Sequence, residues 1–352
     1  MTDLLALTAE LVAVPSESFQ EAALVAWLED ELRAVPGLEV TRVGDNVVAR
    51  TQLGRDQRVV LAGHTDTVPE ADGNGRVRIE GDTLWGLGAS DMKSGLAVML
   101  DLARTVPEPA VDVTWVFYAR EEVAAEHSGL EELVRLRPDL LAGDLAILGE
   151  PTAAAVEAGC QGTLRVEVRL AGARSHSARP WMGRNAIHRL GPLLDAVAAV
   201  PERRPVLAGC EFREALQAVK VEGGVAANVV PDLAVVTLNH RFAPDRTVDE
   251  AVDHVRAVVA PFLDDGDEVL VVDSAPAASP AADHPLLARV IAAHDMEVRA
   301  KLGWTDVARF SALGIPAANI GPGEATLAHT VDERVERAPL EACRAALADL
   351  IG

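Results

Sequence analysis

Hydrophobic positions in the first part of the chain alternate between two kinds of spacing. Residues 3–14 and 19–35 show the period of about 3.6 residues that is typical of amphipathic helices. Short, continuous apolar runs predict buried strands at 46–50, 58–63, 112–119 and 144–149. A further helix is expected over 92–105, between the second and third of these runs. Strands and helices in this order predict an α/β fold with a mixed, mostly parallel sheet.

After about residue 160 the pattern changes. The segment 163–172 alternates strictly between apolar and polar residues, which indicates a strand with one covered face. The elements expected after it are a helix, two strands, a second helix and a last strand, at 183–200, 216–223, 232–242, 247–260 and 267–273. This strand-helix-strand-strand-helix-strand order is ferredoxin-like.

The α/β pattern returns beyond the Pro/Ala-rich segment 275–282, which has the composition of a linker. The expected elements are two helices, a strand and a final helix, from Asp283, at 306–313, at 317–320 and from about residue 339. A chain of 352 residues is long enough for two domains. We expect a catalytic domain formed by 1–162 and 272–352, interrupted by an inserted α+β domain at 163–271.

Composition and charge narrow the class of protein. Hydrophobic residues make up 49% of the chain and charged residues 24%, as in a globular protein. The net charge of −22 disfavours a general affinity for nucleic acid or anionic membranes, and no apolar run approaches the roughly 20 residues of a membrane span. Residues 1–18 lack a basic start, so they predict a first helix and no signal peptide. Three separated cysteines without a CxxC motif predict a cytoplasmic protein without disulfides: Cys160, Cys210 and Cys343.

Acidic and histidine residues follow the predicted strands of the α/β part. Those that end or closely follow a strand are His64, Glu121, Glu122 and Glu150. In open α/β sheets the carboxyl ends of the strands form the ligand-binding edge. Two further candidates are Asp91, in a glycine-rich turn, and His329, in a loop after the strand at 317–320. Imidazoles and carboxylates without thiolates suit Zn²⁺ or a similar divalent ion.

Taken singly, each of these residues is more typical of a helix cap or a solvated loop, and only their combination indicates a site. Asp66 lies two residues after His64, on the same side of a strand end, where it can accept the other imidazole N–H. Six of the nine histidines have no such setting and are interpreted as structural or surface residues: His127, His188, His240, His254, His284 and His294.

Five motifs occur in order along the chain: GHTDTVP (63–69), GASDMKSG (88–95), AREE (119–122), LGEPT (148–152) and LAHTVDE (327–333). In order and spacing they resemble the M20 metallopeptidase family, over about residues 10–335. The resemblance implies an amidohydrolase with a two-zinc catalytic domain and an inserted lid or dimerisation domain. Co²⁺ is the expected substitute metal.

The resemblance also implies a role for each candidate. Asp91 would bridge the two metals, Glu121 would be the general base, and the peptide bond before Met92 would be cis. The residues that would complete the two metal sites are His64 with Glu150, and Glu122 with His329. Two ions ~3.5–4 Å apart can hold both the attacking water and the developing oxyanion of an amide, while a free carboxylate moves the proton.

The segment 171–188 resembles the part of the inserted domain that, in this family, brings a histidine into the partner subunit's active site. The matching residue, His176, would donate a hydrogen bond to the oxyanion, a type of contact worth about 3–4 kcal/mol in known cases. Because such a histidine acts in the partner's site, the resemblance implies a homodimer. From the residues alone, however, His176 is more typical of a turn between a strand and a helix.

Three motifs in the second half are EGGVAANVVPD (222–232), LNHRF (238–242) and KLGWTDVARFSALGIPAANIGPG (301–323). They are most similar to the actinobacterial-type succinyl-diaminopimelate desuccinylases, a branch of the family in lysine and meso-diaminopimelate biosynthesis. Their substrate, N-succinyl-L,L-2,6-diaminopimelate, carries several carboxylates, which arginine binds in bidentate geometry. The substrate-binding residues that this implies are Arg179, Asn228, Arg241, Thr305 and Arg309, with Arg184 as a further candidate. For Arg179 and Arg184 a structural salt bridge is an equal alternative.

Three other functions stay open at this point. The first is another M20 deacylase of small N-acyl amino acids, such as an acetylornithine-type deacetylase or an aminoacylase. The second is a dipeptidase or carboxypeptidase of the same family. The third, outside enzymes, is a metal-binding scaffold on a degenerate hydrolase fold, and the complete set of ligands with Glu121 argues against it.

Overall fold

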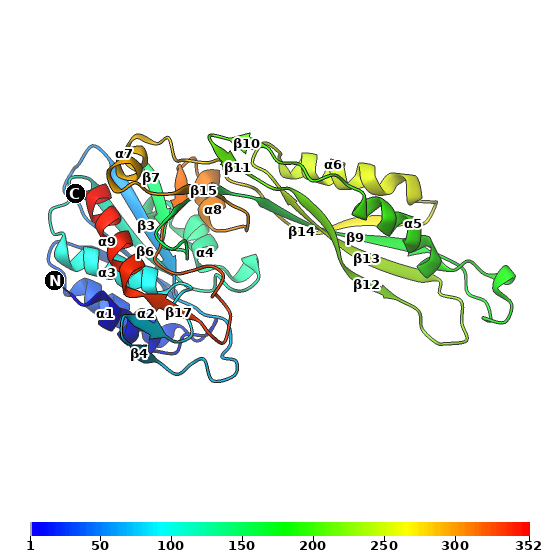
Figure 1. Ribbon diagram of the computed structural model, residues 1–352, viewed down its shortest axis with the longest axis horizontal. Helices are drawn as coiled ribbons and strands as arrows, with labels where there is room; N and C mark the ends of the chain where they lie inside the picture. Colours follow the sequence, from blue (N-terminus) through cyan, green and yellow to red (C-terminus); the bar gives the residue numbers. More distant parts are fainter. Residues whose placement is uncertain (1) are drawn as a thin grey trace. The chain divides into compact units, whose positions relative to one another are not determined.

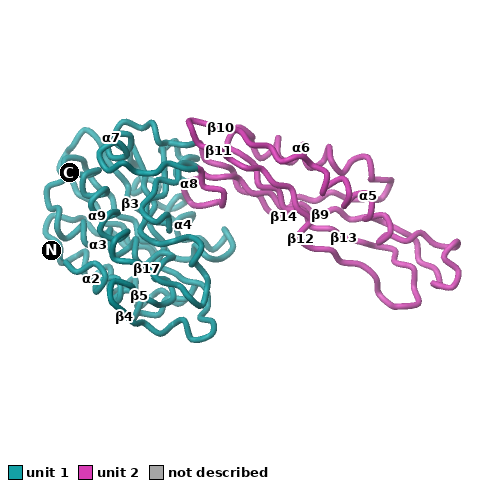
Figure 2. The backbone as a smooth tube through the Cα atoms, viewed as in Figure 1, with its two compact units in different colours: residues 1–159, 280–299, 309–352 teal, residues 160–279, 300–308 magenta. Residues whose placement is uncertain are grey.

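The computed structural model describes residues 2–352, which divide into two compact units (Figure 2). Unit 1 comprises the residues up to 159 together with 280–299 and 309–352, and unit 2 comprises 160–279 and 300–308. Each unit has its own sheet, and each is described by itself below.

The segment 300–308 departs from the predicted division, which placed it in the catalytic domain. Two of its residues are hydrogen-bonded to other residues of unit 2. Gln161 N donates to Lys301 O at 3.2 Å, and the Trp304 indole N–H donates to Pro276 O at 3.2 Å. These contacts join residues far apart in sequence, so the hydrophobic pattern could not reveal them.

Unit 1 is built on an eight-stranded sheet in the order β1-β2-β6-β3-β7-β16-β8-β15. Figure 1 labels β3, β6, β7 and β15 of this sheet. Its strands are β1 Glu39–Val43, β2 Asn46–Arg50, β3 Arg58–His64, β6 Asp112–Tyr118, β7 Leu145–Leu148, β8 Val156–Cys160, β15 Val298–Lys301 and β16 Ala317–Asn319. The central strands β6, β3, β7 and β16 run parallel, and β1, β2 and β8 are antiparallel to their neighbours. The predicted α/β fold with a mixed sheet is confirmed.

Helices accompany this sheet because its central strands are apolar on both faces. All seven residues of β6 are buried, as in a strand that is covered on both sides. The helices outside the insert are α1 Leu4–Val12, α2 Ala22–Arg33, α3 Lys93–Thr105, α4 Gly129–Leu136, α7 Pro285–His294, α8 Val307–Ala312 and α9 Arg337–Ile351. Short 3-10 turns lie at Ala125–His127 and Pro138–Leu140. No helix within residues 2–352 has the length and apolar character needed to cross a membrane.

A small three-stranded sheet was not predicted. Its strands are β4 Arg78–Glu80, β5 Thr83–Trp85 and β17 Arg334–Glu336, in the order β17-β5-β4. The guanidinium groups of Arg78 and Arg334 lie 4.3 and 4.7 Å from the centre of the Trp85 ring. Strands of three residues have no usable periodicity, and β17 joins β5 from the far end of the chain. The helix α4 and the strands β1, β8 and β15 were also not predicted.

Unit 2 has the predicted ferredoxin-like arrangement. Its antiparallel sheet has the order β12-β13-β9-β14, with strands β9 Gly162–Ala171, β12 Ala215–Gly223, β13 Leu233–Phe242 and β14 Glu268–Ala275. The remaining elements are α5 Ala186–Ala198, α6 Val248–Val259, the ribbon β10 Val206–Leu207 with β11 Cys210–Glu211, and 3-10 turns at Pro180–Met182 and Ala260–Phe262.

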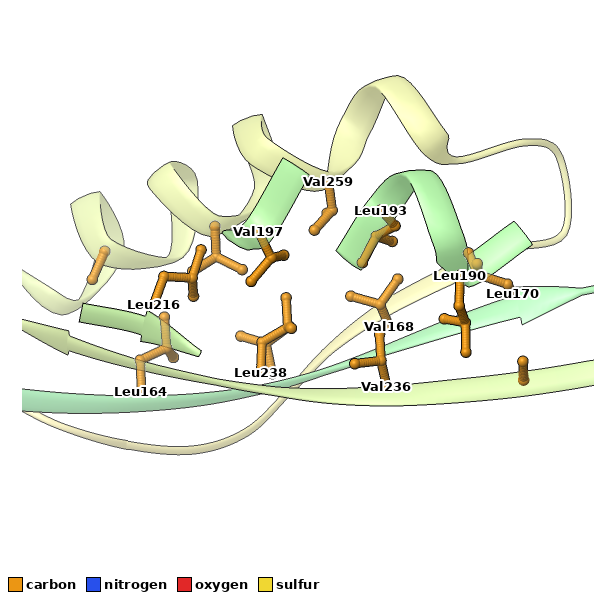
Figure 3. Close-up of a cluster of buried hydrophobic side chains, with 14 of the residues drawn as sticks. Leu164, Val168, Leu170, Leu190, Leu193, Val197, Leu216, Val236, Leu238 and Val259 are labelled. Carbon is orange, nitrogen blue, oxygen red and sulfur yellow. The ribbon is translucent and has the colours of Figure 1, made fainter. Parts of the chain in front are cut away.

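The core of unit 2 follows from the alternation along its strands. Every second residue of β9 is buried, including Leu164 and Val168, and the residues between them are more exposed. The buried side chains of β9 and β13 meet those of α5 and α6, among them Leu193 and Val259 (Figure 3). One face of the sheet therefore carries both helices.

Candidate metal centre

Three neighbouring strands bring the candidate ligands to one edge of the sheet in unit 1. Because β3, β6 and β7 are parallel, their carboxyl ends lie at the same edge. His64 is the last residue of β3 and pairs with Tyr118, the last residue of β6. Glu121 and Glu122 follow β6 closely, and Glu150 follows β7.

Ligand atoms of six residues form three overlapping groups, and within each group they lie no more than 4.8 Å apart. The groups are His64–Asp91–Glu150, His64–Glu121–Glu122 and Asp91–Glu122–His329. The structure thus brings together all five residues that were predicted as ligands and the predicted base. Asp91 is shared by the Glu150 group and the His329 group, which is the position that a bridging ligand needs. The peptide bond between Asp91 and Met92 is cis, as the resemblance implied.

Asp91 lies between two imidazoles. Its Oδ1 is 3.1 Å from His64 Nε2, and its Oδ2 is 3.5 Å from His329 Nε2. Glu122 Oε1 is 2.8 Å from the same His329 nitrogen. Burial by itself would raise the pKa of the Asp91 carboxyl, but hydrogen bonds from His329 and His64 lower it below its ordinary range. Hydrogen bonds to Asp91 and Glu122 raise the pKa of His329 to about 10.

The donor set fits divalent cations. Four carboxylates and two imidazoles converge in the three groups, so protonation of both histidines would still leave excess negative charge. His64 is fully buried, and burial disfavours its charged form, yet Asp66 and Asp91 raise its pKa well above the ordinary value. Carboxylate oxygens with imidazole nitrogens and no thiolate are ligands for Zn²⁺, and a shared carboxylate suits a pair of such ions.

Asp66 has further contacts besides the predicted one with His64. His64 Nδ1 is 3.0 Å from the backbone oxygen of Asp66 and 3.5 Å from its carboxylate, so the main imidazole partner is the carbonyl. The buried carboxylate also accepts from Glu121 N at 3.0 Å, Glu122 N at 3.1 Å and the Ser18 hydroxyl at 2.7 Å. Asp66 therefore holds the backbone from which both glutamates extend.

Three supporting residues were not predicted as functional: Ser18, Arg120 and Glu333. Arg120 has a positive φ of 61° and turns the chain after β6, and its guanidinium donates to His127 O and pairs with Glu132. Glu333 is buried and accepts from the backbone of Ser90 and Asp91. Arg120 and Glu333 belong to motifs that had been recognised, whereas nothing local marked Ser18.

Close backbone contacts also shape the centre, and glycine makes them possible. A Cβ on Gly95, at the start of α3, would lie 2.3 Å from Gly149 O. A Cβ on Gly323 would lie 2.0 Å from Ser90 O, next to the loop that carries Asp91. Any side chain at these two positions would separate the segments that present Glu150 and Asp91.

Three further candidates lie on exposed loops of unit 2: the catalytic candidate His176 and the substrate-binding candidates Asn228 and Arg179. His176 Nδ1 accepts from Ala178 N at 3.0 Å, and its backbone forms an isolated bridge with Val229. Asn228 O accepts from Ser177 N at 2.9 Å. Arg179 is exposed beside the 3-10 turn at Pro180–Met182.

The other four candidates have contrasting surroundings. Arg184 pairs with Asp264, and Arg309 pairs with Glu131, so both have structural ion-pair partners. Thr305 is buried, and its backbone oxygen accepts from the Cys160 thiol. Arg241 is half-buried on β13 and forms no ion pair among the described residues; burial and the nearby charge of Arg165 lower its pKa.

The chain matches the family model of peptidase family M20/M25/M40 over residues 60–352 and belongs to that family of metallopeptidases. Two curated relatives are similar over nearly the whole chain. The putative succinyl-diaminopimelate desuccinylase DapE of Mycobacterium tuberculosis is 52% identical, covering 95% of this chain and 93% of that protein. The succinyl-diaminopimelate desuccinylase of Corynebacterium glutamicum is 47% identical, covering 94% and 91%.

Solved structures share the fold at lower sequence identity. A tripeptidase from Staphylococcus aureus has a TM-score of 0.80 and 21% identity, covering 99% of this chain and 97% of that one. The Bacillus subtilis YXEP protein, described as a dinuclear metal-binding peptidase of the M20 family, has a TM-score of 0.70 and 17% identity, covering 99% and 96%. At such identities the likeness shows the fold.

Proposed function

We propose that the chain is a two-zinc hydrolase that cleaves the amide bond of N-succinyl-L,L-2,6-diaminopimelate to give succinate and L,L-diaminopimelate. The observation that carries the proposal is the similarity to two curated relatives of that printed name, at 52% and 47% identity. The six acidic and histidine residues that converge in unit 1 support the same chemistry. Together they favour a hydrolase over a degenerate scaffold.

In this proposal each subunit holds two zinc ions. The residues that would hold them are His64 and Glu150 for one ion, Glu122 and His329 for the other, and Asp91 for both. When bound, the ions polarise the amide carbonyl and lower the pKa of water to about 7. Co²⁺ would serve as a substitute because it accepts the same oxygen and nitrogen donors.

Glu121 would move the proton. Its carboxylate takes a proton from the attacking water and delivers it to the amine nitrogen as the C–N bond breaks. The hydrogen bonds from Glu121 N and Glu122 N to Asp66 support this role, because they hold the two neighbouring glutamates in a fixed backbone. One side chain can then bind metal while the other stays available as a base.

His176 would donate a hydrogen bond to the developing oxyanion in the partner subunit of a homodimer. In support, His176 lies on an exposed loop of unit 2, whereas every candidate metal ligand belongs to unit 1. The edge strand β12 offers a surface for a second copy, since Val219 and Val221 are 58% and 51% exposed on it.

Mixing two inactive variants tests the dimer. His176→Ala retains Glu121, and Glu121→Gln retains His176, so a mixed dimer contains one complete site only if His176 acts on the partner. We expect activity to return after the two variants are unfolded together and refolded. Mixed dimers, identified by differently tagged subunits, that stay inactive would contradict the action on the partner, and a monomer in light scattering would contradict the dimer.

Arg241 is the best-supported of the substrate arginines. Its half-buried guanidinium has no ion-pair partner among residues 2–352, and a substrate carboxylate would supply the missing negative charge. Arg179, Asn228, Thr305 and Arg309 remain candidates that come from the family resemblance. Arg241→Gln is expected to raise KM for a succinylated substrate more than for an acetylated one.

The substrate is tested by direct comparison. The zinc-loaded protein should turn over succinyl-diaminopimelate faster than acetylornithine or a panel of glycine peptides, at equal concentration. Faster turnover of acetylornithine would identify another deacylase, and faster turnover of the peptides would identify a peptidase.

Glu121→Gln should lower kcat by about 10²–10⁴ and retain zinc, because it removes a base and no ligand. Glu126→Gln is the matched control, since Glu126 lies on the same loop with 78% of its side chain exposed.

A further inference from the structure

Glu333 connects the C-terminal part of the chain to the loop that carries Asp91. Its side chain is 2% exposed, and its Oε1 accepts from Ser90 N and from Asp91 N, both at 3.0 Å. Its backbone oxygen accepts from Gly86 N at 3.1 Å, at the other end of the same loop. One residue therefore holds the loop at both of its ends.

A second set of contacts ties the same loop to the same C-terminal segment. The Ser90 hydroxyl donates to Glu324 O at 2.9 Å and accepts from Glu324 N at 2.7 Å. The bare Cα of Gly323 lets Ser90 O approach closely, because a Cβ there would lie 2.0 Å from it. Between Glu324 and Glu333 lies His329, the candidate ligand whose Nε2 is 3.5 Å from Asp91 Oδ2.

The carboxylate of Glu333 is placed in an environment that opposes its charge. Burial raises its pKa, as does the neighbouring charge of Asp91, while backbone N–H groups of Asp91, Gly88 and Ser90 lower it. The buried Lys93 amine donates to Val14 O at 2.7 Å; burial lowers the pKa of Lys93 to about 7, and the nearby charge of Glu333 opposes that shift. The buried acceptor held there at this cost satisfies the N–H groups of both Ser90 and Asp91.

We propose that Glu333 is a positioning residue for the bridging carboxylate of Asp91. By fixing the Ser90–Asp91 backbone, it keeps the two Asp91 oxygens directed at the two halves of the centre, toward His64 and His329. The segment from Glu324 to Glu333 thus both supplies a ligand and orients the bridge. This inference rests on the proposed metal centre, and it does not depend on which substrate is cleaved.

The test compares zinc binding by purified wild-type protein, Glu333→Ala, Glu333→Gln and Glu336→Ala. Glu333→Ala leaves the N–H groups of Ser90 and Asp91 without their acceptor, so the dissociation constant for zinc should rise about 10–100-fold. Glu333→Gln retains an oxygen acceptor and should recover most of the affinity. Glu336→Ala removes a carboxylate three residues away that contacts Thr83, and it should bind zinc as the wild type does.

Zinc affinity is measured by competition with a chromophoric chelator, on protein whose circular dichroism matches the wild type. A purely structural role would lower the melting temperature of the metal-free protein and leave zinc affinity unchanged, and that result would overturn the inference. An equal loss of zinc affinity in Glu333→Ala and Glu336→Ala would also overturn the inference. At saturating zinc, Glu333→Ala should lower kcat and leave KM within about threefold of wild type, because the bridge acts on the reacting centre and not on remote substrate groups.

Failure of the two proposals can be told apart. If wild-type protein binds two zinc ions and cleaves no N-acyl amino acid, the proposed function is wrong while the zinc comparison still decides the role of Glu333. If the wild type binds zinc no more tightly than Glu333→Ala, the positioning role is wrong even when the substrate is cleaved.

Discussion

At the scale of single residues, Asp66 shows how a buried carboxylate fixes the backbone of the turn that carries Glu121 and Glu122. Its two oxygens accept from Glu121 N, Glu122 N and the Ser18 hydroxyl, and its side chain is fully buried. Burial opposes ionisation of Asp66, but hydrogen bonds, first of all with His64, lower its pKa below the ordinary value. The carboxylate is therefore ionised and able to accept at neutral pH.

Asp66→Asn should weaken both catalysis and zinc binding. An amide can accept through one oxygen only, so its NH₂ group would face a backbone N–H of Glu121 or Glu122 and push that turn away. We expect kcat and zinc affinity to fall by about 10–100-fold each. Steady-state kinetics and zinc titration measure the two effects. Asp56→Asn, on an exposed loop, is the control, and an Asp66→Asn protein with wild-type values would contradict this role.

Zinc binding should release protons. Asp91 and Glu122 raise the pKa of His329 to about 10, and the pKa of His64 is raised as well, so both imidazoles carry a proton at pH 7 before metal binds. A histidine ligand must be neutral, so protons compete with zinc, and apparent affinity should increase as pH rises from about 7 toward 10. Calorimetry in buffers of different ionisation enthalpy should count about two protons per subunit. A binding enthalpy that is independent of buffer would contradict this, and His329→Ala should lose one proton from the count.

At the scale of secondary-structure elements, the start of α3 sets the position of a strand end. Gly95 lies in the first turn of α3, and the backbone of Gly149 passes against it, one residue before Glu150. Helices usually gain stability when glycine is replaced by alanine, by about 0.5–1 kcal/mol. Here the contact reverses that expectation, because an added Cβ would meet Gly149 O at 2.3 Å.

Gly95→Ala should therefore destabilise the protein by about 1–3 kcal/mol, the usual cost of overpacking, and should weaken zinc binding through displacement of Glu150. Gly191→Ala, in the middle of α5, should be close to neutral: no atom outside its chain neighbours lies within 4 Å of the new Cβ, and Pro192, which follows it, offsets the usual helix gain of alanine. Urea unfolding of the two variants measures the difference. The argument fails if Gly95→Ala is as stable as the wild type.

At the scale of the whole molecule, the two units have separate sources of stability. All candidate metal ligands belong to unit 1, whereas unit 2 has its own core of β9, β13, α5 and α6 side chains. Unit 2 also has a buried ion pair between Arg189 and Asp267, which is hydrogen-bonded at 2.5 Å. A ligand stabilises the part of the protein that binds it.

Removal of zinc by a chelator should therefore destabilise unit 1 selectively. At a zinc concentration of 100 times the dissociation constant, one bound ion contributes about 2.7 kcal/mol to stability. Hydrogen exchange with mass spectrometry should show faster exchange in β3, β6 and α3 after chelation, and unchanged exchange in β9 and α5. Equal loss of protection in both units would contradict a metal centre confined to unit 1.

Sequence-based prediction succeeded where a local pattern reflects a local cause. The apolar runs that became β3, β6 and β7 could be read directly, because a strand that is covered on both faces needs apolar side chains throughout. The alternation in β9 similarly indicated one covered face. The positions of His64, Glu121 and Glu150 at strand ends followed from these elements, and their grouping in space followed from the parallel sheet.

Tertiary structure decided what depends on contacts between distant segments. Ser90 and Glu333 are 243 residues apart, and neither residue's neighbours in sequence indicate that they meet. The same holds for Ser18 and Asp66, 48 residues apart, and for β17 beside β5. The imidazole partner of His64 was also a matter of geometry, since the backbone oxygen of Asp66 lies closer than its carboxylate. Hydrophobic periodicity specifies which face of an element is covered, whereas a buried hydrogen bond needs two particular atoms that only the packed chain brings within 3 Å.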